Sequence, residues 1–286
     1  MTPPRIALFA LTGFGNTVLS SLCAEGLKPQ LLITRAESGP FPYYDESPLI
    51  ELAQRLHVPY LYGAEGEEKV AAEPPDIALC ATYHRMLRAP LLANVRWAIN
   101  LHPSLLPKYR GPNPFYWVLR NQERQTGVTA HMMTEAADAG PILLQESILI
   151  SPTETQGSLR QRLASVAAAI GIETIRRVQN GTISPMTQDK SKATSFDRPT
   201  DADRRLPIDW DVDQSDRLIR ALAPFPGAII DAGIVSGVVQ RESASTGPPG
   251  SAVPLGQGLY RLRLCDGDLV VRLATAKPFS RRRGAP

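Results

Sequence analysis

The chain has 286 residues, of which 43% are hydrophobic and 21% charged, and it carries a formal net charge of +3 at pH 7. This composition is typical of a soluble globular protein, so disorder is not the default expectation. No apolar stretch approaches the roughly 20 residues that span a bilayer, and the N-terminus shows no cleavage-site pattern. We therefore expect a cytoplasmic protein without membrane contact.

The cysteines and the distribution of charge narrow the class further. Cys23, Cys80 and Cys265 are isolated, odd in number and mostly in apolar surroundings. We therefore expect reduced, buried thiols, and neither a disulfide framework nor a metal site. Positive charge gathers at the C-terminal end, where eight lysines and arginines from residue 241 onward stand against three carboxylates.

The first hundred residues alternate between apolar runs and helical segments. Residues 5–10 predict a buried strand, and the glycines that follow predict a turn into a helix that ends near Gly26. A helix is predicted from Ser47 through His57, and further strands at 31–34, 60–62, 77–81 and 97–101. This alternation predicts an α/β fold with a Rossmann-like parallel sheet and helices on both of its faces.

The pattern changes after Thr126. Residues 128–132 and 142–150 predict two strands around an Asp-Ala-Gly turn, and residues 158–178 predict a long helix that an Asn-Gly pair closes. A short helix near 213–223 then precedes several short strands separated by turn signals. We expect a first domain over 1–181, a linker over 182–206 and a small β-rich, OB-like domain over 207–286.

Two polar side chains at the end of one predicted strand are the first candidates for chemistry. Asn100 and His102 are two positions apart, so both point to the same side of the sheet, at the edge where open α/β sheets bind ligands. An amide beside an imidazole can hydrogen-bond a developing oxyanion, as acyl transfer requires. Spacing alone leaves open the alternative that both side chains only satisfy backbone groups at the strand end.

The motifs around these residues resemble a known family. The stretch INLHPSLLPKYRG, with TGVTAHMM and Asp138-Ala139-Gly140 downstream, is similar to the formyltransferases that use 10-formyltetrahydrofolate. That family includes methionyl-tRNA formyltransferase and the amino-sugar N-formyltransferases. The resemblance spans most of the chain, is densest from 97 to 145, and implies that Asn100, His102 and Asp138 are catalytic.

The resemblance also implies a role for each of these residues. The neutral amine of the acceptor attacks the formyl carbon, and Asn100 and a protonated His102 donate hydrogen bonds to the oxyanion. Asp138 keeps His102 charged, and it or a water that it holds takes the proton from the attacking nitrogen. The sequence does not decide which group is the base.

Binding residues follow from the same resemblance and from the loops. The folate head is expected between Met86-Leu87 and the segment Asp138, Ala139 and Gly140. Tyr109 and Arg110 are candidates for substrate contact, and Tyr43 and Tyr44 could pack on the acceptor. For Arg110 a structural pairing is the alternative, and for the two tyrosines it is core packing. His84 and His131 are open between function and packing.

The acceptor is less determined than the donor. The loop RAESGPFPYYDESP has one arginine against Glu37, Asp45 and Glu46, and such a loop repels phosphates. We therefore expect the amine or hydroxylamine of a small metabolite, such as a nucleotide-linked amino sugar or an ornithine derivative. Methionyl-tRNA is the alternative, with Arg281-Arg282-Arg283 as a possible nucleic-acid contact. A folate-binding module without turnover is a third hypothesis, which the intact catalytic triplet disfavours. The oligomeric state is not predicted.

Overall fold

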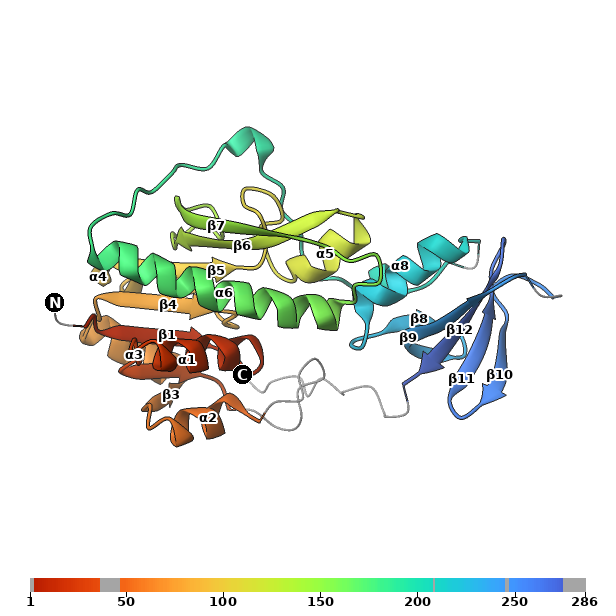
Figure 1. The fold of residues 1–286 in the computed structure, drawn as a ribbon, viewed down its shortest axis with the longest axis horizontal. Helices are drawn as coiled ribbons and strands as arrows, with labels where there is room; N and C mark the ends of the chain where they lie inside the picture. Colours follow the sequence, from red (N-terminus) through yellow and green to blue (C-terminus); the bar gives the residue numbers. More distant parts are fainter. Residues whose placement is uncertain (1–2, 37–46, 208, 245–246, 275–286) are drawn as a thin grey trace. The chain divides into compact units, whose positions relative to one another are not determined.

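A computed structural model describes residues 3–36, 47–207, 209–244 and 247–274 (Figure 1). The chain forms two compact units. Unit 1 comprises Met1–Val118, Glu123–Pro152 and Gly157–Arg198, and unit 2 comprises Leu119–Gln122, Thr153–Gln156 and Pro199–Pro286. The predicted boundaries of the two domains and of the linker stay predictions.

The first nine elements of unit 1 alternate between strand and helix and end in the strand that carries the first candidate residues. They are β1 (Ile6–Ala10), α1 (Phe14–Ala24), β2 (Leu31–Thr34), α2 (Leu49–Arg55), β3 (Tyr60–Tyr62), α3 (Gly63–Ala72), β4 (Ile77–Ala81), α4 (Leu91–Asn94) and β5 (Trp97–His102). The remaining elements are α5 (Pro114–Arg120), β6 (Gln125–Met132), β7 (Ile142–Leu149), α6 (Gln156–Gln179) and the 3-10 helix η1 (Lys190–Lys192).

One seven-stranded sheet organises unit 1, in the order β3-β2-β1-β4-β5-β6-β7. Strands β1 to β5 pair in parallel, and β6 and β7 add to the edge in antiparallel directions. The predicted Rossmann-like parallel sheet is confirmed, and the two later strands extend it. Because parallel strands end at one edge, the residues that follow β1, β2, β4 and β5 gather at their carboxyl ends.

Helices cover both faces of this sheet, because its strands are apolar on both sides. On one face Ala78, Cys80 and Ala98 join a buried cluster with Val70 of α3 and Leu91 of α4. On the other face α6 packs so closely that a Cβ added at Gly171 would lie 3.2 Å from a methyl of Leu101. Figure 1 shows α1 and α6 together on this second face.

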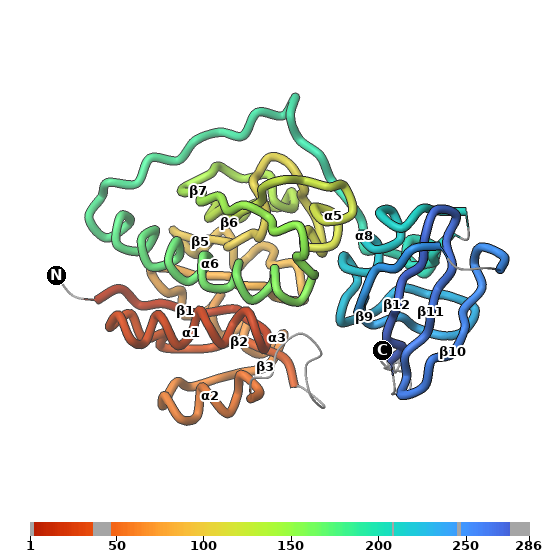
Figure 2. The backbone as a smooth tube through the Cα atoms, turned by 45° about the vertical axis from the view of Figure 1, so that its right-hand side comes forward, coloured from red at the N-terminus to blue at the C-terminus, as the bar shows by residue number. Residues whose placement is uncertain are grey.

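After α6 the chain returns to the sheet. Met186 forms an antiparallel bridge with Ile142 at the start of β7, with both backbone hydrogen bonds at 2.8 Å. Figure 2 shows this returning segment, which runs from the end of α6 past β7. Residues 182–198, predicted as linker, therefore lie within unit 1 and contact the edge of its sheet.

Unit 2 is a small sheet covered by one amphipathic helix. Its helices are α7 (Asp201–Arg204) and α8 (Val212–Leu222), and its strands are β8 (Ala228–Ile230), β9 (Gly233–Glu242), β10 (Ala252–Gly256), β11 (Leu259–Arg263) and β12 (Asp268–Leu273). The strands pair antiparallel in the order β10-β11-β12-β9-β8, which confirms the predicted β-rich domain; its OB-like closure stays a prediction.

Two further expectations concern the cysteines and the absence of a membrane-spanning helix. Cys80 is buried as expected, but Cys265 is exposed, because it begins the tight turn between β11 and β12 rather than lying in a strand. Among the described residues, no helix is both long enough and apolar enough to cross a membrane.

Candidate active site

The pleat of β5 creates the site. Ile99 and Leu101 are fully buried on one face of the strand, so Asn100 and His102 both point to the other. Strand β6 runs antiparallel beside β5 in a register that pairs Asn100 with His131. Residues paired across neighbouring strands share a face, which brings His131 to the same cluster.

Asp138 completes the cluster from the loop between β6 and β7. Its Oδ1 lies 3.3 Å from Asn100 Nδ2, and 3.5 Å from both His102 Nδ1 and His131 Nε2. Its Oδ2 accepts a 2.8 Å hydrogen bond from the backbone amide of Gly111. The three predicted catalytic residues therefore meet around one carboxylate, together with a histidine that the sequence left undecided.

Each histidine of the cluster has one ring nitrogen against a backbone carbonyl. The Nε2 atom of His102 lies 2.8 Å from the carbonyl oxygen of Tyr109, while its Nδ1 faces Asp138 at 3.5 Å. The Nδ1 atom of His131 donates to the carbonyl of Met132 at 2.8 Å, so in the neutral ring Nε2 accepts from Asn100 Nδ2 at 3.1 Å. His131 thereby fixes the orientation of the Asn100 amide.

Burial and neighbouring groups shift the pKa values within the cluster. Burial alone would raise the pKa of Asp138, but His102, His131 and the Gly111 amide together lower it well below its usual range. Burial lowers the pKa of His102, although the charge of Asp138 opposes this effect. Asp138 is therefore a carboxylate at neutral pH.

Cys80 lies next to the cluster but cannot act as a nucleophile at neutral pH. It pairs with Asn100 across β4 and β5. Burial raises the pKa of its thiol to about 12, so it stays protonated. The site therefore suits direct transfer between two bound molecules rather than a thioester on this residue.

Tyr109 and Arg110, predicted to contact substrate, have other partners in the structure. Tyr109 is buried, donates from its hydroxyl to Glu123 at 2.7 Å and stacks on Phe196. The guanidinium of Arg110 donates to the side-chain oxygen of Gln188 at 2.6 and 3.2 Å. Each of the two side chains thus holds the loop after β5 to another segment, and their contact with substrate stays a prediction.

The predicted folate residues belong to the loop after β4 and to the loop between β6 and β7. Met86 is half exposed, whereas Leu87 is buried in the core cluster beside Leu91. Gly140 is required by a close approach, because a Cβ there would lie 1.9 Å from the carbonyl oxygen of Met132. Ala139 donates its amide to the carbonyl of Ala136 at 3.3 Å. Tyr43 and Tyr44 lie outside the described residues.

His84 marks a group of cations near the carboxyl ends of β2 and β4. Its pKa is lowered by partial burial and by the positive charges of Arg35, Arg85 and Arg198. Arg85 also pairs with Glu67, at 2.6 Å. Glu67 therefore offsets part of the positive charge of this group.

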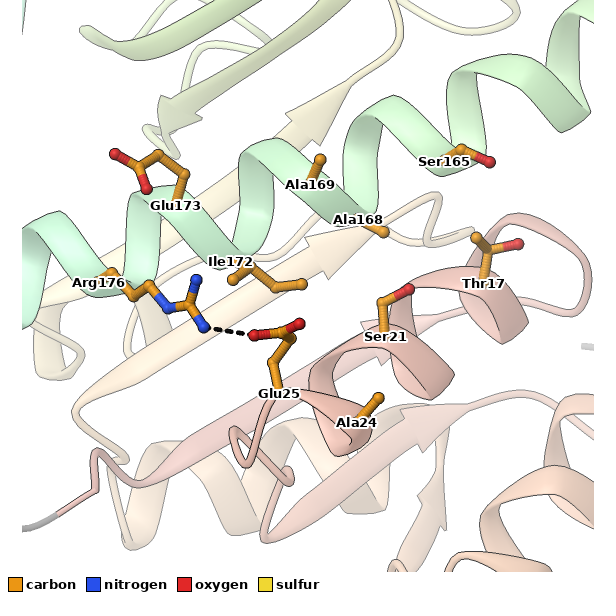
Figure 3. Close-up of a pocket in the computed structure, with 10 residues that line it drawn as sticks. All are labelled: Thr17, Ser21, Ala24, Glu25, Ser165, Ala168, Ala169, Ile172, Glu173 and Arg176. Carbon is orange, nitrogen blue, oxygen red and sulfur yellow. Dashed lines mark hydrogen bonds and ion pairs between the residues drawn. The ribbon is translucent and has the colours of Figure 1, made fainter.

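A groove in unit 1 lies away from the cluster around Asp138. It has a volume of about 460 Å³ and runs between α1 and α6 (Figure 3). Its lining is small or polar, with Ser21 and Ala168 on opposite helices and an ion pair between Glu25 and Arg176. None of the predicted site residues lines it. Among the described residues, no group of three or more histidine, cysteine, aspartate or glutamate side chains is arranged to hold a metal ion.

Comparisons with known proteins identify the relatives of this chain. A family model described as formyl transferase matches residues 36–175. The methionyl-tRNA formyltransferase of Halorhodospira halophila is 31% identical over 284 residues, covering 95% of this chain and 92% of that protein. The enzyme of the same name from Aromatoleum aromaticum is also 31% identical, covering 99% of this chain and 92% of its own.

A solved structure shares the fold over nearly the whole length. It is the N-formyltransferase of Helicobacter canadensis in complex with folinic acid and dTDP-3-aminofucose. The TM-score is 0.72 at 17% identity, and the match covers 94% of this chain and 98% of that one.

Proposed function

The chain belongs to the formyl transferase family and is a formyl-transferring enzyme, and we propose that it moves the formyl group of 10-formyltetrahydrofolate to the amine of a small metabolite. The convergence of Asn100, His102 and His131 on the carboxylate of Asp138 carries this proposal. Relatives with this fold support the donor, since the Helicobacter canadensis protein was solved with folinic acid.

The proposed reaction is a direct acyl transfer. The lone pair of the neutral amine attacks the formyl carbon, and the formyl oxygen becomes an oxyanion. The proton that the attacking nitrogen loses passes to Asp138 or to a water that Asp138 holds. The bond between the formyl carbon and N10 then breaks, N10 takes up a proton, and the products are a formamide and tetrahydrofolate.

Asn100 is the proposed donor to the oxyanion. One Nδ2 proton is directed to His131, and the other makes a longer contact of 3.3 Å with Asp138. When the oxyanion forms, this second Nδ2 proton would leave Asp138 and hydrogen-bond the oxyanion. Asn100 would then be a donor already in place for the developing negative charge. Both nitrogens of His102 already face protein oxygens and burial lowers its pKa, so its proposed contribution is to hold the Asp138 carboxylate in place rather than to donate directly to the oxyanion.

The donor is proposed to bind across the loops at the strand ends. Met86 and Leu87 offer an apolar side and the backbone of Asp138, Ala139 and Gly140 a polar one, as the resemblance implies. The head group of the folate would then lie beside the cluster, with its formyl carbon within reach of Asn100.

A small acceptor suits the distribution of charge better than a nucleic acid. In unit 2, eight arginines between residues 199 and 274 stand against ten carboxylates. Several of these arginines already pair within the unit, as Arg220 does with Asp216 and Arg261 with Glu242. The basic excess at the C-terminal end therefore comes from residues 275–286, outside the described part, and the folded sheet has no cationic surplus to attract a phosphate backbone. A phosphate on a small acceptor has the cations around His84 within the same unit as the cluster.

Methionyl-tRNA is the second candidate acceptor. The specific observation in its favour is that relatives named methionyl-tRNA formyltransferase match over nearly the whole chain, including unit 2. Residues 281–283, three consecutive arginines, supply the part of the chain best suited to contact phosphates.

An acceptor panel tests the proposal. Tetrahydrofolate formation from 10-formyltetrahydrofolate would be followed with nucleotide-linked amino sugars, hydroxyornithine and methionyl initiator tRNA. We expect turnover with a small amine that persists in a variant truncated after Ala274. Turnover with methionyl-tRNA alone, lost on truncation, would establish the second candidate. Absence of donor-dependent turnover with every acceptor would contradict the proposed small-amine acceptors.

A further inference from the structure

Gln188 is a buried polar side chain that no step of the proposed reaction uses. It lies in the segment between α6 and η1, which sequence analysis assigned to a linker, and only 5% of its surface is exposed. A buried amide must find partners for its nitrogen and its oxygen or lose stability. Its partners therefore indicate what it holds together.

All hydrogen-bonding positions of this amide are used. Its Nε2 donates to the carbonyl oxygens of Asp138 at 2.8 Å and Gly140 at 2.7 Å. Its Oε1 accepts from the guanidinium of Arg110 at 2.6 and 3.2 Å. Because carbonyls only accept and guanidinium groups only donate, the chemistry of the partners fixes which end of the amide is which.

These bonds join the two loops that form the carboxylate's surroundings. Gly111, next to Arg110, donates its amide to the carboxylate of Asp138 at 2.8 Å, while Gln188 holds the backbone of Asp138. Asp138 has a φ of 51°, in the left-handed region that non-glycine residues seldom adopt. Such a conformation persists where surrounding contacts hold it. Gln188 supplies one of those contacts on each side of Ala139.

We infer that Gln188 is a positioning residue for formyl transfer: its amide holds the backbone of Asp138 and Gly140 so that the Asp138 carboxylate faces Asn100 and His102. The inference rests on the proposed function. Arg110 acts in the same assembly, because it fixes the Gln188 amide through the oxygen. Gln188, in the segment predicted as a linker, thereby contributes to the site although it lies 50 positions after Asp138 in the chain.

Two variants and one control separate positioning from packing. Gln188→Glu keeps the shape of the side chain and its bond to Arg110, but it removes both N–H donors. Gln188→Ala removes the whole amide. The control is Gln156→Ala, because Gln156 is also fully buried and its Nε2 donates to a backbone carbonyl, that of Phe225 at 2.9 Å, in unit 2.

The first measurement needs no ligand. The carboxyl carbon of Asp138 would be followed by NMR against pH in each protein, with His102, His131 and the Gly111 amide as the groups that face it. We expect the carboxyl of the original protein to stay ionised throughout the pH range in which it is folded. In both Gln188 variants we expect the Asp138 carboxyl to titrate nearer the usual aspartate value. In the Gln156 variant we expect this carboxyl to behave as it does in the unsubstituted protein.

The second measurement is steady-state tetrahydrofolate formation. A misplaced catalytic group commonly costs about 10-fold to 100-fold, so we expect kcat to fall by that order in both Gln188 variants and to be unchanged in Gln156→Ala. A Gln188→Glu protein with the original titration and kcat would overturn the inference. If the original protein shows no turnover, the proposed function fails, and the titration alone still decides the role of Gln188.

Discussion

The carboxyl edge of the sheet and the groove between α1 and α6 are both polar regions of unit 1, but they are built differently. At the edge, one carboxylate with a side chain only 14% exposed faces two histidines and an asparagine. In the groove, the pair of Glu25 and Arg176 is about half exposed on the surface of two helices (Figure 3). The groove is a hollow with an exposed ion pair, whereas the edge brings buried polar and charged groups together around one carboxylate.

This difference shows that a buried cluster of polar groups, rather than a hollow on the surface, indicates an active site. Exposed ion pairs are screened by water and contribute little to stability. Buried polar groups are costly unless they are mutually satisfied, so a cluster such as that around Asp138 persists only with a fixed set of partners. The fixed geometry of the edge is what electrostatic stabilisation of a transition state requires.

The largest effect that separates the two regions is expected at the carboxylate. Asp138→Asn keeps the shape of the side chain but removes the charge that faces His102, and with it the proposed proton acceptor. We expect a loss of about 100-fold to 10,000-fold in kcat, the usual range for an acid–base group. Steady-state tetrahydrofolate formation measures it, and a loss below about 5-fold would show that Asp138 is not part of the chemistry.

A medium effect is expected in the stability of the protein against acid. The folded-state pKa values of Asp138 and His102 are both lowered, so each contributes stability that is present above its unfolded pKa and lost as pH falls. Chemical denaturation should therefore give a falling free energy of unfolding below about pH 6.5, where histidine begins to bind protons in the unfolded chain.

The Asp138→Asn variant sharpens this measurement. At pH 7 the original protein should be more stable than the variant by on the order of 2 kcal/mol, because the variant lacks the shifted carboxylate. The gap should narrow as pH falls below about 4, where the unfolded-state carboxyl is protonated. A gap that stays constant with pH would contradict the proposed environment of Asp138.

The smallest effect is expected in the groove. Arg176→Ala removes the pair with Glu25, which lies on the surface, so the free energy of unfolding should change by less than about 1 kcal/mol. The kcat of formyl transfer should be unchanged. A loss of turnover comparable to that of Asp138→Asn would mean that the groove, and not the edge, contains the reaction.

The sequence predicts those parts of the site that have a local signal. The period of two along β5 places Asn100 and His102 on one face, and the resemblance adds Asp138. His131 was left open between function and packing because a single histidine has no informative spacing; its register opposite Asn100 places it in the cluster. A prediction of antiparallel pairing between β5 and β6 would have found it.

The contacts that the sequence does not reveal join residues that are far apart along the chain. Arg110 binds Gln188, 78 positions away, and Tyr109 binds Glu123, 14 positions away. Nothing in the loop SLLPKYRG indicates these partners, so both side chains were expected to face substrate. The polar composition of residues 182–206 likewise indicates a linker, although part of this segment lies in unit 1 and Gln188 is buried there.

The most direct test of the account is tetrahydrofolate formation by the original protein, Asn100→Ala and Asn94→Ala with the best acceptor from the panel. Asn94 is the matched control, an exposed asparagine whose amide donates to the carbonyl of Ala71. We predict a loss on the order of 100-fold to 1,000-fold in kcat for Asn100→Ala and none for Asn94→Ala. An Asn100→Ala protein that folds and retains most of its turnover would contradict the central claim that the oxyanion forms beside this residue.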